Sequence, residues 1–149
     1  ITAIGCGIEG NFNLDNIRYS KVIIICDSDP AGGHISSLLM VFFAKFMSPI
    51  IKNGKLFLCE TPLDGIGYGK DFVPLWTKDE LEKARNEGKK IRHFKGLGEF
   101  STSELKQLAF DKNRRLIPVL WSDKVDQIFD LISDSKKKRL LAQNQWTLV

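Results

Sequence analysis

The chain has few of the features that mark secreted, zinc-binding or membrane proteins. Among its 149 residues are three cysteines, Cys6, Cys26 and Cys59, and none of them forms a C-x-x-C pair. This usage is typical of reduced, buried thiols in a cytosolic protein and shows neither a disulfide framework nor a zinc motif. The longest apolar run is far too short to cross a membrane, and the N-terminus lacks the basic start of a signal peptide.

The chain also has no initiator methionine, so we expect it to be a processed or truncated piece. Its apolar fraction of 43% is sufficient for one domain with a real core. The order of expected elements along the chain is strand, helix, strand, irregular segment, helix, strand, helix, strand, helix, which is typical of an α/β fold.

The segment that points to chemistry is an unbroken apolar strand, Lys21–Ile25, followed by Asp27 and Asp29. Residues two apart on an extended chain share a side, so both carboxylates can face one ion. A continuous β-branched strand is typical of a parallel sheet, where ligands bind beyond the carboxyl ends of the strands. The pattern predicts a divalent metal site, although Asp-Ser-Asp-Pro alone is equally compatible with a simple turn.

A helix is expected directly after this turn. Gly32 and Gly33 permit unusual backbone geometry, and apolar residues then recur at helical spacing from Ile35 to Phe46, until Pro49 is expected to stop the helix. His34 falls in the first helical turn, where a hydrogen-bonding or DNA-facing role is commoner than metal ligation.

The remaining elements follow from capping and turn signals. Thr77 and Ser101 each start a capping-box pattern, Gly88 is a natural helix end, and the glycine-rich stretch of residues 64–70 is expected to form a hairpin loop. The expected strands are Lys55–Cys59 and Lys90–Phe94, a further extended run is Leu116–Trp121, and Ser122 can cap a last amphipathic helix.

Positive charge gathers in two places although the net charge is only +4. One is the run Lys136–Arg139, and the other comprises Lys89, Lys90, Arg92, His93 and Lys95. A charged run is usually a solvated face, but two clusters in a chain that also has an acidic metal turn favour a nucleic-acid partner.

The second segment of interest is Lys95-Gly96-Leu97-Gly98-Glu99, which lies between an expected strand and an expected helix. Two glycines around one leucine indicate a close approach of the backbone to another part of the chain. A bare turn explains the pattern equally well.

Together these segments resemble the TOPRIM region of the B subunits of type II topoisomerases of the gyrase and topoisomerase IV kind. The resemblance spans most of the chain and rests on the order of its motifs. The segments are Ile1–Ile8, Leu14–Tyr19, the acidic turn Asp27–Ile35, Thr61-Pro62-Leu63, the Phe94–Glu99 element and Phe110–Leu116. The resemblance therefore implies a TOPRIM-like open parallel sheet with helices on both faces, plus a C-terminal helical tail.

The resemblance implies Mg²⁺-dependent help in cleaving and religating duplex DNA during ATP-driven strand passage. Asp27 and Asp29 correspond to metal ligands with a catalytic role. Lys95 corresponds to a basic catalytic residue near the DNA gate, and the alternative is that it only supports the turn. His34, Arg92 and His93 would lie near DNA. The structural motif residues would be Gly32, Gly33, Gly96, Leu97, Gly98 and Glu99.

The implied partners are duplex DNA, an A-type subunit that carries the attacking tyrosine, and the ATPase portion of the B-type polypeptide, which is absent from this chain. The implied location is the cytoplasm of a bacterial or phage-infected bacterial cell, without a membrane. Divergence from bacterial members is compatible with a bacteriophage source. By itself the chain is expected to be inactive.

Three departures from the family pattern affect these expectations. Ala31 stands where the family has a third aspartate, so a second metal ion should be held less firmly. The catalytic Glu-Gly-x-Ser-Ala motif has no equivalent in the chain, and His93 stands where bacterial members usually have arginine. The missing glutamate would come from an upstream segment or a partner.

The expected organisation has three parts. Residues 1–20 lead into the acidic strand, with the first TOPRIM strand missing upstream; residues 21–121 form the TOPRIM core with an inserted loop at 61–76; and residues 122–149 form a basic helical tail. Two other functions stay open: a different TOPRIM nucleotidyl-transfer protein of the primase or nuclease type, favoured by Ala31-Gly32, and a non-catalytic DNA-binding assembly subunit.

Overall fold

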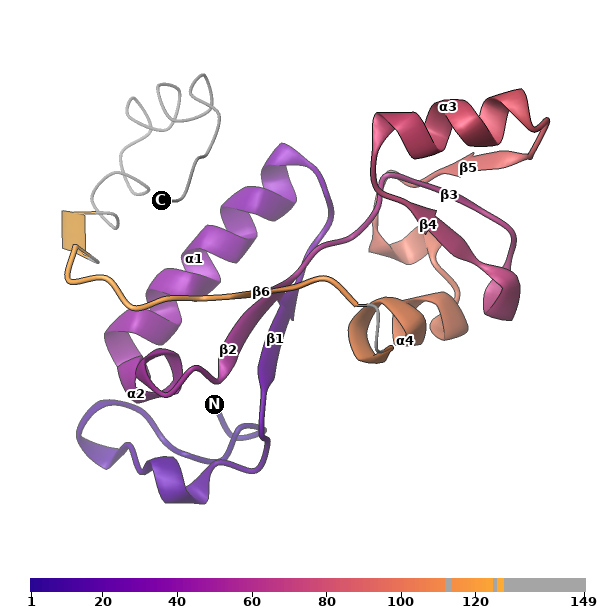
Figure 1. The fold of residues 1–149 in the computed structure, drawn as a ribbon. Helices are drawn as coiled ribbons and strands as arrows, with labels where there is room; N and C mark the ends of the chain where they lie inside the picture. Colours follow the sequence, from indigo (N-terminus) through magenta and orange to yellow (C-terminus); the bar gives the residue numbers. More distant parts are fainter. Residues whose placement is uncertain (112–113, 125, 128–149) are drawn as a thin grey trace. The chain divides into compact units, whose positions relative to one another are not determined.

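The structure is a computed structural model that describes residues 1–111, 114–124, 126 and 127. Its elements are drawn in Figure 1. The helices are α1 (Pro30–Phe46), α2 (Ser48–Lys52), α3 (Lys78–Asn86) and α4 (Thr102–Phe110), and the strands are β1 (Val22–Ile25), β2 (Leu56–Cys59), β3 (Asp64–Ile66), β4 (Val73–Leu75), β5 (Ile91–His93) and β6 (Leu116–Pro118). The predicted α/β class is confirmed.

The chain divides into two compact units, each discontinuous in sequence. The first contains Ile1–Ser20, Ser37–Lys55 and the described part of Val119–Val149, and the second contains Lys21–Ser36 and Leu56–Pro118. All the predicted site residues fall in the second unit.

The first unit contains the apolar end of α1 and the short helix α2. Met47, Ile50 and Ile51 are buried there. The expectation that Pro49 stops the helix is wrong in detail, because α1 ends at Phe46 and Pro49 lies in the first turn of α2. Proline is tolerated at that position since the first N–H groups of a helix have no intrahelical partner.

One sheet of the second unit has the order β1-β2-β6. Strands β1 and β2 are parallel, with Val22 opposite Leu56 and Ile25 opposite Cys59. Strand β6 pairs with the other edge of β2 in antiparallel fashion, so the sheet is mixed rather than wholly parallel. The acidic turn follows the carboxyl end of β1, as predicted.

The other sheet of this unit is antiparallel and has the order β4-β3-β5. Strands β3 and β4 form a hairpin, with Asp64 opposite Leu75. The predicted hairpin is present, but Asp64–Ile66, which were expected in its loop, form strand β3. Gly67 and Gly69 in its turn have φ angles of +75° and +61°, which only glycine adopts easily. Helix α3 contacts β4 and β5, beside which it is drawn in Figure 1.

An aromatic cluster forms the core beside this sheet. Phe72, Phe94 and Phe100 are buried together with Leu108, and Leu97 packs against them. The rings of Phe94 and Phe100 are stacked, with centroids 4.0 Å apart and planes 17° apart, and Phe72 meets both rings edge-on. Such offset and edge contacts add to the stabilisation from buried area.

The sequence signals for helix starts and ends are confirmed. Both capping boxes, Thr77 with Glu80 and Ser101 with Glu104, are present, and Gly88 has the positive φ of a helix end. The three cysteines are free thiols, of which Cys26 is only half-buried. No helix in the described ranges is long and apolar enough to span a membrane.

Two expectations remain predictions. The amphipathic helix after Ser122 and the basic run Lys136–Arg139 lie almost wholly outside the described residues. The proposed boundaries at residues 20 and 121 are also predictions, and the segment 61–76, expected as an inserted loop, contains the strands β3 and β4.

Candidate functional site

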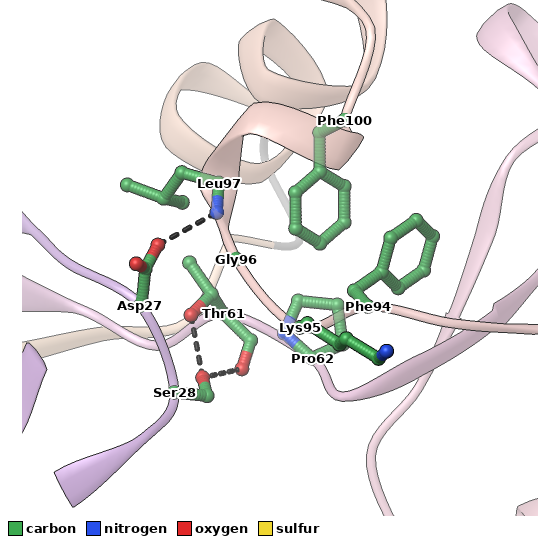
Figure 2. Close-up of a pocket in the computed structure, with 9 residues that line it drawn as sticks. All are labelled: Asp27, Ser28, Thr61, Pro62, Phe94, Lys95, Gly96, Leu97 and Phe100. Carbon is green, nitrogen blue, oxygen red and sulfur yellow. Dashed lines mark hydrogen bonds between the residues drawn. The ribbon is translucent and has the colours of Figure 1, made fainter.

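Asp27 is held by the backbone of a segment that lies 70 positions later in the chain. Its Oδ1 accepts a hydrogen bond of 2.6 Å from the backbone N–H of Leu97. Figure 2 shows this bond between the tip of the acidic strand and the Gly96-Leu97 backbone. The two segments singled out by the sequence, the acidic turn and Lys95–Glu99, therefore meet in one place.

Two glycines, one from each segment, lie against this aspartate. A side chain at Gly32 would overlap the backbone carbonyl oxygen of Asp27, so the first turn of α1 can pack there only without one. At Gly96, an added Cβ would lie 3.2 Å from Oδ2 and 3.3 Å from Oδ1 of Asp27. The close backbone approach expected around Leu97 is confirmed at Gly96, where its target is the Asp27 carboxylate, but not at Gly98, where an added Cβ would meet nothing within 4 Å.

Asp29 begins helix α1. Its Oδ1 accepts a hydrogen bond of 2.6 Å from the backbone N–H of Gly32, three residues later, which is the bond of a helix N-cap. Pro30 follows at the first helical position, where its fixed φ suits a helix start. Helix α1 thus begins at Pro30, earlier than expected, and both Gly32 and Gly33 lie inside it.

Hydroxyl groups join the ends of β1 and β2 at the same place. The hydroxyl of Ser28 donates to the backbone carbonyl of Thr61, and its Oγ lies 2.5 Å from Thr61 Oγ1. Thr61 Oγ1 in turn donates to the carbonyl of Cys26 over 3.1 Å. Sequence reasoning missed Ser28. The only signal for it in the sequence was its position next to Asp27.

A pocket is lined by residues of three segments of the second unit. They are Asp27, Ser28, Thr61, Pro62, Phe94, Lys95, Gly96, Leu97 and Phe100. Lys95 is exposed. Its ammonium group points away from Asp27 in Figure 2. The pocket therefore offers a carboxylate at one end, hydroxyls along its wall and a cation at the other end.

The segment between β5 and α4 is closed by its flanking aromatic residues. Phe94 precedes Lys95 and Phe100 follows Glu99, and their rings stack on each other. Leu97 and Glu99 belong to a short 3₁₀ turn between them. The stacked pair brings the two ends of the segment together, which fixes the direction in which the Leu97 N–H points.

Arg92 and Glu104 form a buried pair under this segment. Arg92 Nη1 donates to Glu104 Oε1 over 2.6 Å, and the side chains are 16% and 1% exposed, respectively. The guanidinium also donates to the carbonyls of Gly67 and Glu99 and lies over the ring of Tyr68. Arg92 thus holds a hairpin turn, the Lys95–Glu99 segment and α4 together; a DNA contact by Arg92 stays a prediction.

The pKa of Glu104 reflects this arrangement. Burial alone raises it, but the Arg92 hydrogen bond and the backbone N–H groups of Ser101 and Gly69 hold the pKa of Glu104 at about 2. The sequence indicates Glu104 only as the capping-box partner of Ser101. No local pattern shows that the start of α4 is covered by Arg92 from strand β5.

The two histidines expected near DNA have different surroundings. His93 is exposed, and its Nδ1 lies 3.0 Å from Asp64 Oδ1 across the β3–β5 pair. His34 is half-buried on α1, in its second turn rather than its first. Their roles toward DNA, like that of Lys95, stay predictions.

The donor set fits magnesium. Mg²⁺ typically binds protein through one or two carboxylates and keeps several waters. Asp27 and Asp29 each use Oδ1 to accept a backbone N–H, and within the described part of the chain no hydrogen bond reaches Oδ2 of either. No cluster of three or more His, Cys, Asp or Glu residues suited to a metal occurs among the described residues. As donors, the two carboxylates suit a largely hydrated ion, although only Asp27 is among the residues that line the pocket.

Comparison with known proteins shows which sequences this chain is similar to. No protein-family model matches the chain. It is 38% identical over 149 residues to the B subunit of DNA topoisomerase 4 from Mycoplasma capricolum, 36% over 139 residues to the B subunit of DNA gyrase from Mycoplasmoides gallisepticum and 32% over 154 residues to the gyrase B subunit from Archaeoglobus fulgidus. These matches cover 95%, 89% and 97% of the chain but only 23%, 22% and 24% of the respective relatives.

Proposed function

Since the chain belongs to the family of DNA gyrase and topoisomerase IV B subunits, we propose that it forms the part of a type II topoisomerase that holds Mg²⁺ beside the DNA during cleavage and religation. The observation that carries the proposal is the hydrogen bond from the Leu97 N–H to Asp27. It joins the two motifs that resemble the family into a single site at the end of β1.

Each residue of the site has a separate task. Asp27 and Asp29 present the oxygens that hold the ion, with their other oxygens fixed by backbone N–H groups. A bound ion would supply charge neutralisation at the scissile phosphate and at the departing 3′ oxygen. Lys95, exposed at the pocket, attracts the phosphate backbone of DNA. His93 and His34 are further candidates for DNA contacts.

The remaining parts of the reaction belong to partners. The attacking tyrosine is carried by an A-type subunit, ATP is bound by the ATPase portion of the B-type polypeptide, and the substrate is duplex DNA in the cytoplasm of a bacterial or phage-infected cell. Alone, residues 1–149 are expected neither to cleave DNA nor to hydrolyse ATP.

The test is DNA cleavage by the reconstituted complex of both topoisomerase subunits. Asp27→Asn keeps an amide oxygen to accept the Leu97 N–H but removes the negative charge that holds a cation. We expect D27N to lose Mg²⁺-dependent cleavage by at least about 100-fold while DNA binding persists. The matched control is Asp79→Asn, at an exposed position on α3. Cleavage by D27N at the wild-type rate would contradict the proposal.

The second candidate, a non-catalytic assembly subunit, has one observation in its favour. Both carboxylates already have structural partners, because Asp27 accepts from Leu97 and Asp29 caps α1. In that case D27N behaves like the wild type, since it keeps the hydrogen bond. Asp27→Ala, which removes the acceptor, then weakens the fold and the assembly with the A-type partner without a specific loss of cleavage chemistry.

A further inference from the structure

We propose that Gly96 and the backbone N–H of Leu97 are positioning elements for the Asp27 carboxylate, and that the missing side chain at position 96 sets how tightly the site holds a divalent cation. The inference rests on the proposed function, because it assumes that Asp27 is a metal ligand. In this inference the Lys95–Glu99 segment affects ion binding through Gly96 and Leu97, independently of Lys95.

The backbone of Gly96 does not itself require glycine. Its φ of −164° is extended and open to any residue. What is particular to the position is the space in front of it, where a Cβ would lie 3.2 Å from Oδ2 and 3.3 Å from Oδ1 of Asp27. Both distances are shorter than ordinary van der Waals contact, so the carboxylate would have to shift by a few tenths of an ångström to admit a side chain.

The carboxylate is restricted from the other directions as well. The Leu97 N–H holds Oδ1 at 2.6 Å, and the backbone of Asp27 is packed against Gly32. An added methyl group at position 96 would therefore displace the carboxylate by rotation of its own side chain rather than by a shift of the strand. Oδ2, the oxygen offered to the ion, is the atom nearest to the added group.

Magnesium is sensitive to such a displacement. It requires near-ideal octahedral geometry with short bonds, and groups that orient a metal ligand typically contribute about 10–100-fold to metal affinity. The chain supplies its own control in Gly98, two residues further along. A Cβ at Gly98 would meet nothing within 4 Å, and its φ is not in the positive range.

The experiment compares Gly96→Ala with Gly98→Ala in the full-length protein. Mn²⁺ affinity is measured by electron paramagnetic resonance as a stand-in for Mg²⁺, the melting temperature is measured without metal, and cleavage is measured against Mg²⁺ concentration in the complex with the A-type partner. We expect G96A to weaken Mn²⁺ binding by about 10–100-fold and to shift the Mg²⁺ requirement of cleavage upward, with excess Mg²⁺ restoring activity. G98A should match the wild type in all three measurements.

Equal Mn²⁺ affinity for G96A and G98A, with a wild type that binds Mn²⁺, would overturn this inference alone. A G96A protein that no longer melts cooperatively without metal would assign Gly96 to folding and overturn it too. A wild type that fails to bind Mn²⁺ would instead overturn the proposed function, and this inference with it. The wild-type measurement therefore separates the two failures.

Discussion

Arg92 and Glu104 form a salt bridge of 2.6 Å in which the carboxylate is almost wholly removed from solvent. One partner comes from strand β5 and the other from the first turn of α4, with the Lys95–Glu99 segment between them in sequence. Burial of an ion pair is favourable only when further hydrogen bonds satisfy both groups, as they do here. The pair thus supports the structure around the Lys95–Glu99 segment.

The first prediction concerns the dependence of stability on pH. The pKa of Glu104 is lowered from 4.5 to about 2 in the folded state, so its stabilisation is complete above pH 4.5 and is lost as the pH falls toward 2. The contribution is roughly 3 kcal/mol. Urea unfolding measures the difference in unfolding free energy between the wild type and Glu104→Gln. This difference should be smaller at pH 3 than at pH 7.

Other carboxylates also titrate in this range, which is why the difference between the two proteins is the relevant quantity. A gap between the wild type and E104Q that stays constant from pH 7 to pH 2 would show that the pKa of Glu104 is the same in the folded and the unfolded protein.

The second prediction concerns the stacked rings at the ends of the Lys95–Glu99 segment. Phe100→Ala should lower the unfolding free energy by about 3–5 kcal/mol, because a ring that is 7% exposed leaves a cavity beside Phe94. Phe110→Ala is the control, since that side chain is 71% exposed and should contribute less than about 1 kcal/mol. Chemical denaturation of both variants measures this, and equal losses would show that the stack is not part of the core.

A third prediction separates two adjacent glycines of α1. Gly32→Ala should destabilise the protein by about 1–3 kcal/mol, because its methyl group would overlap the backbone of Asp27. Gly33→Ala should stabilise it by about 0.5–1 kcal/mol, because a Cβ there meets nothing within 4 Å and alanine favours helix. Thermal unfolding of the two variants should move in opposite directions; a loss from both would mean that the first turn is packed differently.

The fourth prediction divides the two tasks of Asp29. Asp29→Ala removes the cap of α1 and should lower the unfolding free energy by about 0.5–2 kcal/mol, whereas Asp29→Asn keeps a capping oxygen and should be nearly neutral. Both variants should weaken Mn²⁺ binding, because both lack the charge. Unchanged Mn²⁺ affinity in D29N would limit Asp29 to its capping role.

The sequence predicts what depends on neighbouring residues. The apolar run of β1, the capping boxes at Thr77 and Ser101 and the helix end at Gly88 all follow from local rules, and all are present. Such rules do not decide the role of Pro49, because proline can follow one helix or begin another. Here it lies in the first turn of α2, in which Ile50 and Ile51 are buried.

Contacts between distant segments are beyond such rules. The order of strands in a sheet, the pairing of Arg92 with Glu104 and the role of Ser28 depend on which segments the fold brings together. The glycines around Leu97 indicate a close backbone approach, but only the structure shows that the approach is to Asp27.

The hydrogen bond between Asp27 and Leu97 also imposes an order of events in folding. Closing a loop of 70 residues has an entropic cost that is recovered only when the strands and aromatic rings between its ends have packed. During synthesis the carboxylate leaves the ribosome long before its partner does. Asp27 therefore reaches its final orientation only after the surrounding unit has folded. In a chain that stops before Leu97, nothing from that segment orients the Asp27 carboxylate.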